Sequence, residues 1–204
     1  RPDRFLYVLL RPNWTSWLVR GAYIITAFSG IITLLIIGHW LGWDLSWIKY
    51  PGFFLAFLSA IYTAFLFNQA KGRDYWQSPL LWMHMLIHAL MAGTVIMLIF
   101  GSNSVQQLIG FLIGLISLNL ILLVIETLVP HRSIDNRKTV FMMKRGYFFL
   151  WFAAGILIGN LLPLLMIVGN HGTSITILAG FLVLIGIFLT EYVRVYAPQV
   201  VSLS

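Results

Sequence analysis

Cysteine is absent from this chain, and charged residues are scarce. None of the 204 residues is a cysteine, and only 9% are Asp, Glu, Lys or Arg. The lack of cysteine excludes disulfides, thiolate zinc sites, iron–sulfur ligation by the chain itself and a cysteine nucleophile. The scarcity of charge excludes an ordinary soluble domain, of whose residues about a quarter are charged.

Apolar residues make up most of what is present. They account for 60% of the chain, and the mean hydropathy is +0.91. A hydrocarbon layer of about 30 Å is crossed by about 20 helical residues, so six spans with short connections use nearly the whole chain. No room is left for a soluble domain. The segment from Arg1 to Arg11 has no signal-peptide pattern and does not begin with Met, so we expect a fragment of a longer protein.

Six long apolar runs predict six helices, because an open chain in lipid satisfies its backbone hydrogen bonds only as helix. The most polar stretch, residues 131–138, is predicted to be the main loop outside the membrane. The expected fold is all-α, a polytopic transmembrane helix bundle of about six helices. The predicted spans are residues 16–40, 51–68, 78–100, 105–129, 140–168 and 173–196.

The positive charges are distributed unequally between the two membrane surfaces. With six spans, 12 of the 13 Lys and Arg lie on or near the side that holds both chain ends, and only Lys49 lies on the other. The positive-inside rule therefore predicts that the side with 12 charges is cytoplasmic. Because these charges flank helices and form no folded basic face, the expected partner is membrane lipid and not nucleic acid.

Ionisable side chains inside predicted spans are candidates for function, because each is costly in hydrocarbon unless it is paired or hydrated. They gather in the half of the protein nearer the cytoplasm, and the other half is almost purely apolar. This asymmetry predicts a hydrated pocket in which protons can be exchanged. The intramembrane or interfacial set is Arg20, Asp74, His84, His88, Glu126, Arg145 and Glu191.

Two structural interpretations compete with proton exchange. Snorkelling to the lipid head groups is favoured for Arg20, Arg145 and Arg194, because each lies within about two turns of a predicted helix end. For Glu126 and Glu191, a structural ion pair with Arg145 or Arg194 is as good an explanation as a proton-transfer role.

The histidine pair lies on one helix face. His84 and His88 are four residues apart, and His88 is either a neutral histidine bonded between helices or a protonatable relay. A haem between them is disfavoured because haem iron is commonly bound from opposite faces, whereas these two rings point the same way. The pair also lacks the intervening glutamate of hydrolytic zinc motifs. No haem or metal bound by this chain is predicted.

Small and polar residues mark predicted packing faces. The fifth span holds Asn160, which is expected to bond across helices, and Pro163, which frees a backbone carbonyl. Glycines four residues apart predict close helix approach at two places, Gly110 with Gly114 and Gly155 with Gly159.

Three stretches of sequence resemble one known family. Residues 14–21 (WTSWLVRG) are similar to the Thr-Ser-Trp…Arg-Gly signature of the polysulfide reductase/NrfD family of quinone-reactive membrane subunits. Residues 70–81 (AKGRDYWQSPLL) look like the family's loop with Ser-Pro-Leu-Leu, and residues 145–204 are similar to its last two helices. These stretches follow one another in the family's order between residues 14 and 204.

The resemblance implies a fold of eight helices in two four-helix bundles, of which this chain would lack the first two helices. Residues 16–76 would then be part of an N-terminal helical bundle, and residues 77–204 would be a C-terminal four-helix bundle. The family's motif loop implies quinone contacts at Tyr75 first, then Asp74, Trp76, Gln77 and Arg20. Polar residues of the second bundle imply a proton path through His84, His88, Glu126, Arg145 and Glu191.

The resemblance also implies cofactor and partners. The chain would be the membrane anchor of a respiratory oxidoreductase in the cytoplasmic (inner) membrane of a bacterium or archaeon. It would exchange electrons between quinone, either menaquinone or ubiquinone, and a docked iron–sulfur subunit, often joined to a molybdopterin enzyme. A proton or ion transporter that uses the buried His and Glu residues is the alternative, and a purely structural anchor is a third.

Overall fold

The computed structural model describes residues 10–101, 104–129, 133–169 and 172–201, and within these ranges the chain is helical and contains no strand. Six helical segments of the described residues are long and apolar enough to cross a membrane. The all-α, six-span prediction is therefore confirmed. The chain divides into two compact units, Arg1–Ala70 and Lys71–Ser204.

The first unit is a helical hairpin of α2 (Trp17–Leu41) and α3 (Lys49–Asn68), joined through the short helix η1 (Ser46–Ile48). The turn after α2 depends on Gly42, whose φ of 71° is the left-handed conformation that glycine adopts without steric penalty. The Trp43 N–H closes this turn by donating to the Gly38 carbonyl at 2.8 Å.

The two helices of the hairpin pack closely along one face. Gly21 leaves room for the ring of Tyr62, because a Cβ there would lie 2.3 Å from a ring carbon. The rings of Trp17 and Phe65 stack with centroids 4.5 Å apart. Few apolar side chains of these helices are buried, and most are exposed or partly exposed, which suits helices surrounded by lipid.

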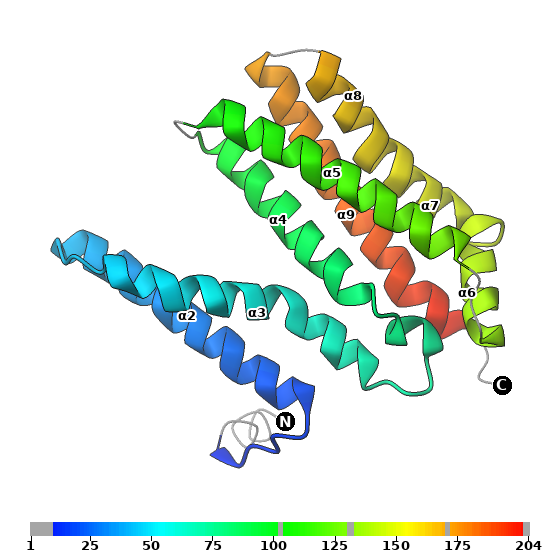
Figure 1. The fold of residues 1–204 in the computed structure, drawn as a ribbon, viewed down its shortest axis with the longest axis horizontal. Coiled ribbons are helices and arrows are strands. Elements are labelled where there is room, and N and C mark those ends of the chain that lie inside the picture. The colour runs from blue at the N-terminus through cyan, green and yellow to red at the C-terminus, as the bar shows by residue number, and fades with distance from the viewer. Residues whose placement is uncertain (1–9, 102–103, 130–132, 170–171, 202–204) are drawn as a thin grey trace. The chain divides into compact units, whose positions relative to one another are not determined.

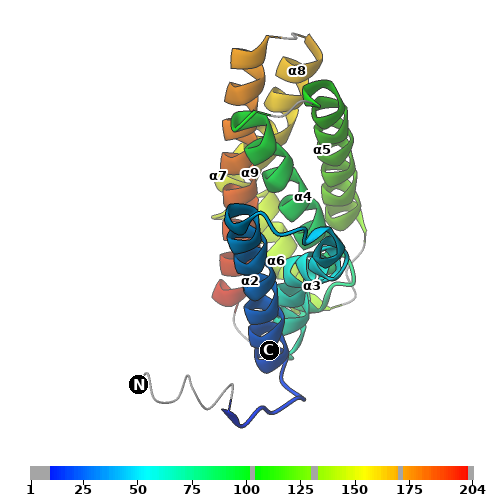
Figure 2. The ribbon, with the colours of Figure 1, turned by 90° about the vertical axis from the view of Figure 1, so that its left-hand side faces the viewer.

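The second unit is a four-helix bundle, visible in Figures 1 and 2. Its helices are α4 (Leu81–Ile99), α5 (Val105–Leu128), the continuous α7–η3–α8 segment (Phe149–Ile156, Leu157–Leu161 and Leu162–Gly169) and α9 (Thr173–Val200). The half of the bundle that contains the end of α4 and the start of α5 has an apolar core. Its fully buried members include Met91, Val95, Leu112, Ile116 and Val183.

The fifth span begins later than predicted. A separate helix, α6 (Ile134–Lys144), ends at Arg145, and the spanning helix starts at Phe149. The chain turns at Gly146, and the Phe148 N–H donates back to the Met142 carbonyl at 3.2 Å. Because α6 carries polar and charged residues over its first turns, it lies outside the apolar run.

The predicted loop 131–138 is corrected in the same region. Residues 130–132 lie outside the described residues, and Ile134 to Lys138 form the first turns of α6. Asp135 lies in the first turn of this helix and Lys144 in its last, where each charge is favourable to the helix dipole.

The predicted glycine contacts hold for one pair and fail for the other. A Cβ on Gly159 would lie 2.0 Å from the Cα of Gly186 on α9, and one on Gly155 would lie 2.8 Å from Thr190. The α7–η3–α8 segment therefore approaches α9 closely at these glycines. Gly110 and Gly114 have open space where a Cβ would lie, so the prediction of close helix packing at this pair is wrong.

Candidate functional site

Residues 70–81, here called the motif loop, are attached to the end of α9. Pro198 has no N–H, so it leaves the carbonyl of Arg194, four residues earlier, without its helical partner. The indole Nε1 of Trp76 donates to this carbonyl at 3.0 Å. Nη1 of Arg73 donates to the carbonyls of Pro198 and Val201 at 2.8 and 2.6 Å. These bonds fix the short helix η2 (Asp74–Gln77) against α9.

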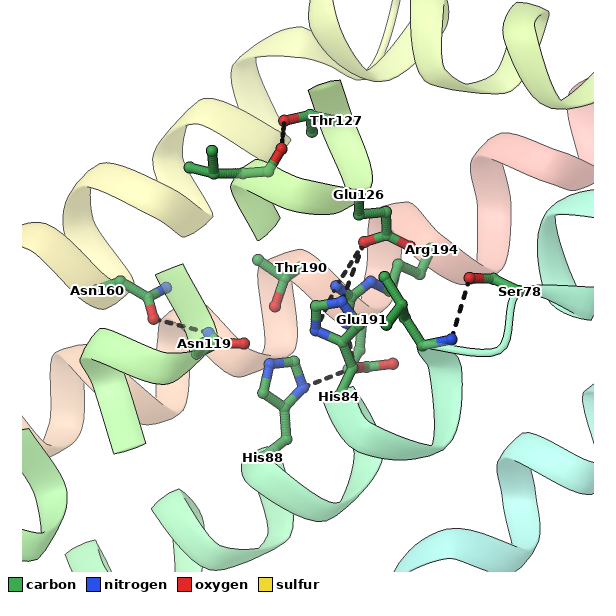
Figure 3. Close-up of polar contacts among 12 residues, drawn as sticks. Ser78, His84, His88, Asn119, Glu126, Thr127, Asn160, Thr190, Glu191 and Arg194 are labelled. Carbon is green, nitrogen blue, oxygen red and sulfur yellow. Dashed lines mark hydrogen bonds and ion pairs between the residues drawn. The ribbon is translucent and has the colours of Figure 1, made fainter. Parts of the chain in front are cut away.

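A cluster of ionisable side chains lies in the bundle just inside this loop (Figure 3). Arg194 on α9 is at its centre and is only 1% exposed. Its Nη2 donates to Oε2 of Glu126 on α5 at 3.0 Å, and its Nη1 donates to Oε1 of Glu191 at 3.3 Å. A buried guanidinium needs such partners, because an unpaired charge in a low-dielectric interior costs several kcal/mol.

His84 on α4 joins the cluster through both ring nitrogens. Its Nδ1 lies 2.8 Å from Nη2 of Arg194, and its Nε2 lies 3.2 Å from Oε2 of Glu126. Arginine can only donate, so Nδ1 of His84 is the acceptor and the ring proton is on Nε2, facing the carboxylate. His84 therefore links α4 to α5 and α9 as a neutral histidine.

His88 pairs with the second carboxylate. Its Nδ1 lies 2.6 Å from Oε1 of Glu191, a short distance typical of a charge-assisted hydrogen bond. The Glu191 side chain is 23% exposed, whereas that of His88 is 6% exposed. The cluster of five residues, Arg194, Glu126, Glu191, His84 and His88, thus joins three helices of the bundle.

Tyr75 belongs to the motif loop, and its side chain is buried, with 3% exposed. Its hydroxyl is close to Glu126 and Arg194. Burial, and after it the negative charge of Glu126, raise the pKa of the Tyr75 hydroxyl well above its ordinary value. Tyr75 is therefore a neutral phenol at the edge of the cluster.

A pocket of about 550 Å³ opens beside the motif loop and reaches the cluster. Glu126, which is only 5% exposed, is both a wall residue of this pocket and a member of the cluster. The pocket therefore connects a polar opening to a carboxylate paired with Arg194. Its lining residues are Asp74, Gln77, Ser78, Pro79, Leu80, Glu126, Val129, Ser133 and Asn136.

A second polar contact lies deeper in the bundle. Nδ2 of Asn119 on α5 donates to Oδ1 of Asn160 at 2.8 Å, and Nδ2 of Asn160 donates to the Gly155 carbonyl at 2.9 Å. Asn160 lies in η3, a π-helical turn just before Pro163. Since Pro163 cannot donate to the carbonyl four residues earlier, the helix widens there. The predicted cross-helix bond of Asn160 is confirmed.

The structure brings together four of the five residues predicted for the proton path. His84, His88, Glu126 and Glu191 meet in the cluster, whereas Arg145 is exposed at the end of α6. The snorkelling interpretation is wrong for Arg194, because this side chain is buried between the two glutamates. The three-residue spacing of Glu191 and Arg194 on one helix face was the signal that could have placed Arg194.

The residues predicted to contact quinone differ in position. Asp74 and Gln77 line the pocket, Tyr75 is buried behind it, and Trp76 holds the loop to α9. Arg20 belongs to the first unit, where its Nε donates to the Trp14 carbonyl at 2.6 Å. The guanidinium of Arg20 also lies 4.9 Å from the ring centroid of Trp17. Its part in a quinone pocket stays a prediction.

Metal ligation has no support in the described part of the chain. No group of three or more His, Cys, Asp or Glu side chains there could hold a metal ion. The side chains of the cluster can hold or pass a proton and hydrogen-bond a polar molecule in the pocket.

The fold and the site define a multi-pass helical membrane protein with a buried ionic cluster near one end of its spans. The family model for polysulphide reductase, NrfD, matches residues 1–202, so the chain belongs to this family of membrane subunits of polysulphide and related reductases. The suspected resemblance is confirmed. Neither the curated proteins nor the solved structures yielded a match.

Proposed function

We propose that the chain is a membrane anchor that exchanges electrons between quinone and a docked iron–sulfur subunit of a respiratory oxidoreductase. The observation that carries this proposal is the pocket beside the motif loop, whose wall includes the buried Glu126. Membership of the NrfD family supports it. The cytoplasmic membrane of a bacterium or archaeon is the proposed location.

The pocket suits a quinone head group. Its volume of about 550 Å³ falls within the range of small-molecule sites, about 300–1,000 Å³. Asp74, Gln77, Ser78 and Asn136 place polar groups around apolar residues, which is the usual composition of such sites. A bound quinone, menaquinone or ubiquinone, would supply the exchange of two electrons and two protons.

The residues of the chain have separate tasks in this proposal. The amide of Gln77 and the hydroxyl of Ser78 orient the head group by hydrogen bonds, and Asp74 accepts from a hydroxyl. Glu126 takes or returns a proton at its carboxylate, because it is the pocket residue that belongs to the cluster. Arg194 holds that carboxylate in place, and the neutral Tyr75 hydroxyl lies beside it.

The electron partner must carry its own metal centres. The chain has no cysteine with which to ligate an iron–sulfur cluster. We therefore assign the iron–sulfur cluster to a separate subunit, which is joined to a molybdopterin enzyme. This partner would dock on the side of the second unit that carries the motif loop and α6, because the pocket opens there.

Quinol turnover by the native complex tests the proposal. Asp74→Asn and Glu126→Gln should lower turnover at least tenfold, because general acid–base groups typically contribute about 10²–10⁴ in rate. Lys138→Gln is the control, since this lysine is about half exposed on α6 and lies outside the pocket lining. Normal turnover in both site variants would overturn the assignment.

One observation favours a second candidate, a proton transporter. The cluster holds two carboxylates and two imidazoles within the spanning part of the bundle, which is the type of side chain that proton paths use. Proteoliposomes that contain the chain alone separate the two functions. Proton flux without quinone or partner would favour the transporter, and its absence together with quinol turnover in the complex would favour the anchor.

A further inference from the structure

The formal charges of the cluster do not balance. Arg194 contributes one positive charge, and Glu126 and Glu191 contribute two negative charges. With both histidines neutral, the sum is therefore minus one. Because a buried net charge is strongly disfavoured, such a cluster gains stability by holding one additional proton. The other titratable group beside it is Tyr75, which is neutral.

His84 is unsuited to accept this proton. Its Nδ1 already accepts a hydrogen bond from Nη2 of Arg194 at 2.8 Å. A proton on Nδ1 would place two N–H groups against each other and would break that bond. The ring is also fully buried, so no solvent reaches it directly. His84 therefore positions Arg194 and Glu126 and does not titrate with them.

His88 has the geometry that His84 lacks. Its Nδ1 faces Oε1 of Glu191 at 2.6 Å, and a proton between these atoms converts the contact into a charge-assisted hydrogen bond. Glu191 is the more exposed of the two carboxylates, 23% against 5% for Glu126. The His88–Glu191 pair can therefore hold a proton without disturbing the bonds of Arg194 to Glu126.

The opposite nitrogen of His88 also lacks a partner. Nε2 of His88 and Oδ1 of Asn119 are both buried, and neither has a hydrogen-bond partner within the described residues. Both residues lie on the side of the cluster away from the motif loop. His88 is about 6 Å beyond His84 along α4, and Asn119 is about 10 Å before Glu126 along α5. Each of the two atoms therefore keeps an unused capacity for a hydrogen bond.

We propose that the His88–Glu191 pair is the site at which the cluster holds its one exchangeable proton, whereas His84 is a fixed, neutral positioning residue. In the loaded state the pair carries the proton and the cluster is neutral. On release, the proton leaves from His88 and the cluster becomes negative by one charge. The inference deepens the proposed function and rests on it for its physiological role, because it names where a proton exchanged with the pocket is stored.

Nitrogen NMR of the full chain in detergent, with ¹⁵N-labelled histidine rings, tests this assignment. The His84 ring should show the neutral form with its proton on Nε2 at every pH at which the chain stays folded. The His88 ring should change from the doubly protonated to the neutral form as the pH rises. Loss of the matching signals in His84→Gln and His88→Gln assigns the two rings.

A second set of variants keeps the test decisive if a cluster variant does not fold. Replacing His39, His131 and His171 by Gln leaves only the two cluster rings, and Glu191→Gln should then shift the titration of one ring and not of the other. Titration of His84, or of neither ring, would overturn the proposal. The measurement needs no quinone or partner, so it tests the proton site alone. Normal quinol turnover in Asp74→Asn and Glu126→Gln would overturn the proposed function instead.

Discussion

Nη2 of Arg194 lies 3.0 Å from Oε2 of Glu126, and both side chains are at least 95% buried. The two residues are 68 positions apart, on α9 and α5. Their contact therefore joins two helices of the bundle through opposite charges in an apolar surrounding. Removing one partner of such a pair leaves the other charge buried and unpaired, which is the basis of the first prediction.

Arg194→Met should destabilise the second unit by about 3–5 kcal/mol, the typical result of breaking a buried pair from one side. Thermal unfolding in detergent, followed by circular dichroism, measures this loss. Arg145→Met is the matched control, because Arg145 is exposed at the end of α6 and should change stability little. Equal effects of the two substitutions would show that the cluster does not stabilise the bundle.

The close approach of Gly159 to Gly186 predicts a large effect from one methyl group. Gly159→Ala would place a Cβ 2.0 Å from the Gly186 Cα, so the helices must separate, at a cost of about 1–3 kcal/mol or more. Gly114→Ala adds the same methyl group in open space and should not destabilise. Thermal unfolding of both variants checks this, and a destabilised Gly114→Ala with an unaffected Gly159→Ala would contradict the packing.

The Asn119–Asn160 hydrogen bond predicts coupling between α5 and the π-helical turn. A double-mutant cycle with Asn119→Leu and Asn160→Leu should give a coupling free energy of about 0.6–2 kcal/mol, the range for side-chain hydrogen bonds within membranes. Unfolding in a denaturing detergent mixture measures it. Strict additivity of the two single substitutions would show that the bond contributes nothing to stability.

Because its pKa is raised, the Tyr75 hydroxyl is predicted not to ionise where ordinary tyrosines do. Over the pH range near about 10 in which ordinary tyrosines ionise, Tyr75 should stay protonated, so the folded wild type and Tyr75→Phe should gain equal tyrosinate absorbance. The raised pKa also fixes how the contribution of Tyr75 to folding stability depends on pH. The contribution of Tyr75 is complete below the ordinary tyrosine pKa and is lost as the pH rises toward the higher pKa of the folded state. A smaller absorbance gain in Tyr75→Phe would show that Tyr75 ionises normally.

Helix positions could be predicted from the sequence because lipid leaves a chain few alternatives. Runs of about 20 apolar residues must be helical, and five of the six predicted spans agree with the structure to within a few residues. The start of the fifth span was wrong, because the apolar residues Val140, Phe141, Met142 and Met143 continue α6 and merge with the next run in the sequence. Only the turn at Gly146 separates them.

The members of the site could be predicted in part. A histidine or glutamate inside a span has few stable surroundings except a polar cluster, so His84, His88, Glu126 and Glu191 were recognisable. Arginines near helix ends are different, because a long side chain can reach the head groups or turn inward. Burial of Arg194 and exposure of Arg145 depend on which helices pack against them, and this is a tertiary property.

Photolabelling of the native complex with an azido-quinone tests the central claim most directly. We predict that the label attaches within residues 74–80, near Glu126 or at the start of α6, the three parts of the chain that line the pocket, and that excess quinone prevents it. Peptide mapping by mass spectrometry locates the label. Labelling that is confined to other helices, or that excess quinone leaves unchanged, would contradict a quinone site at this pocket.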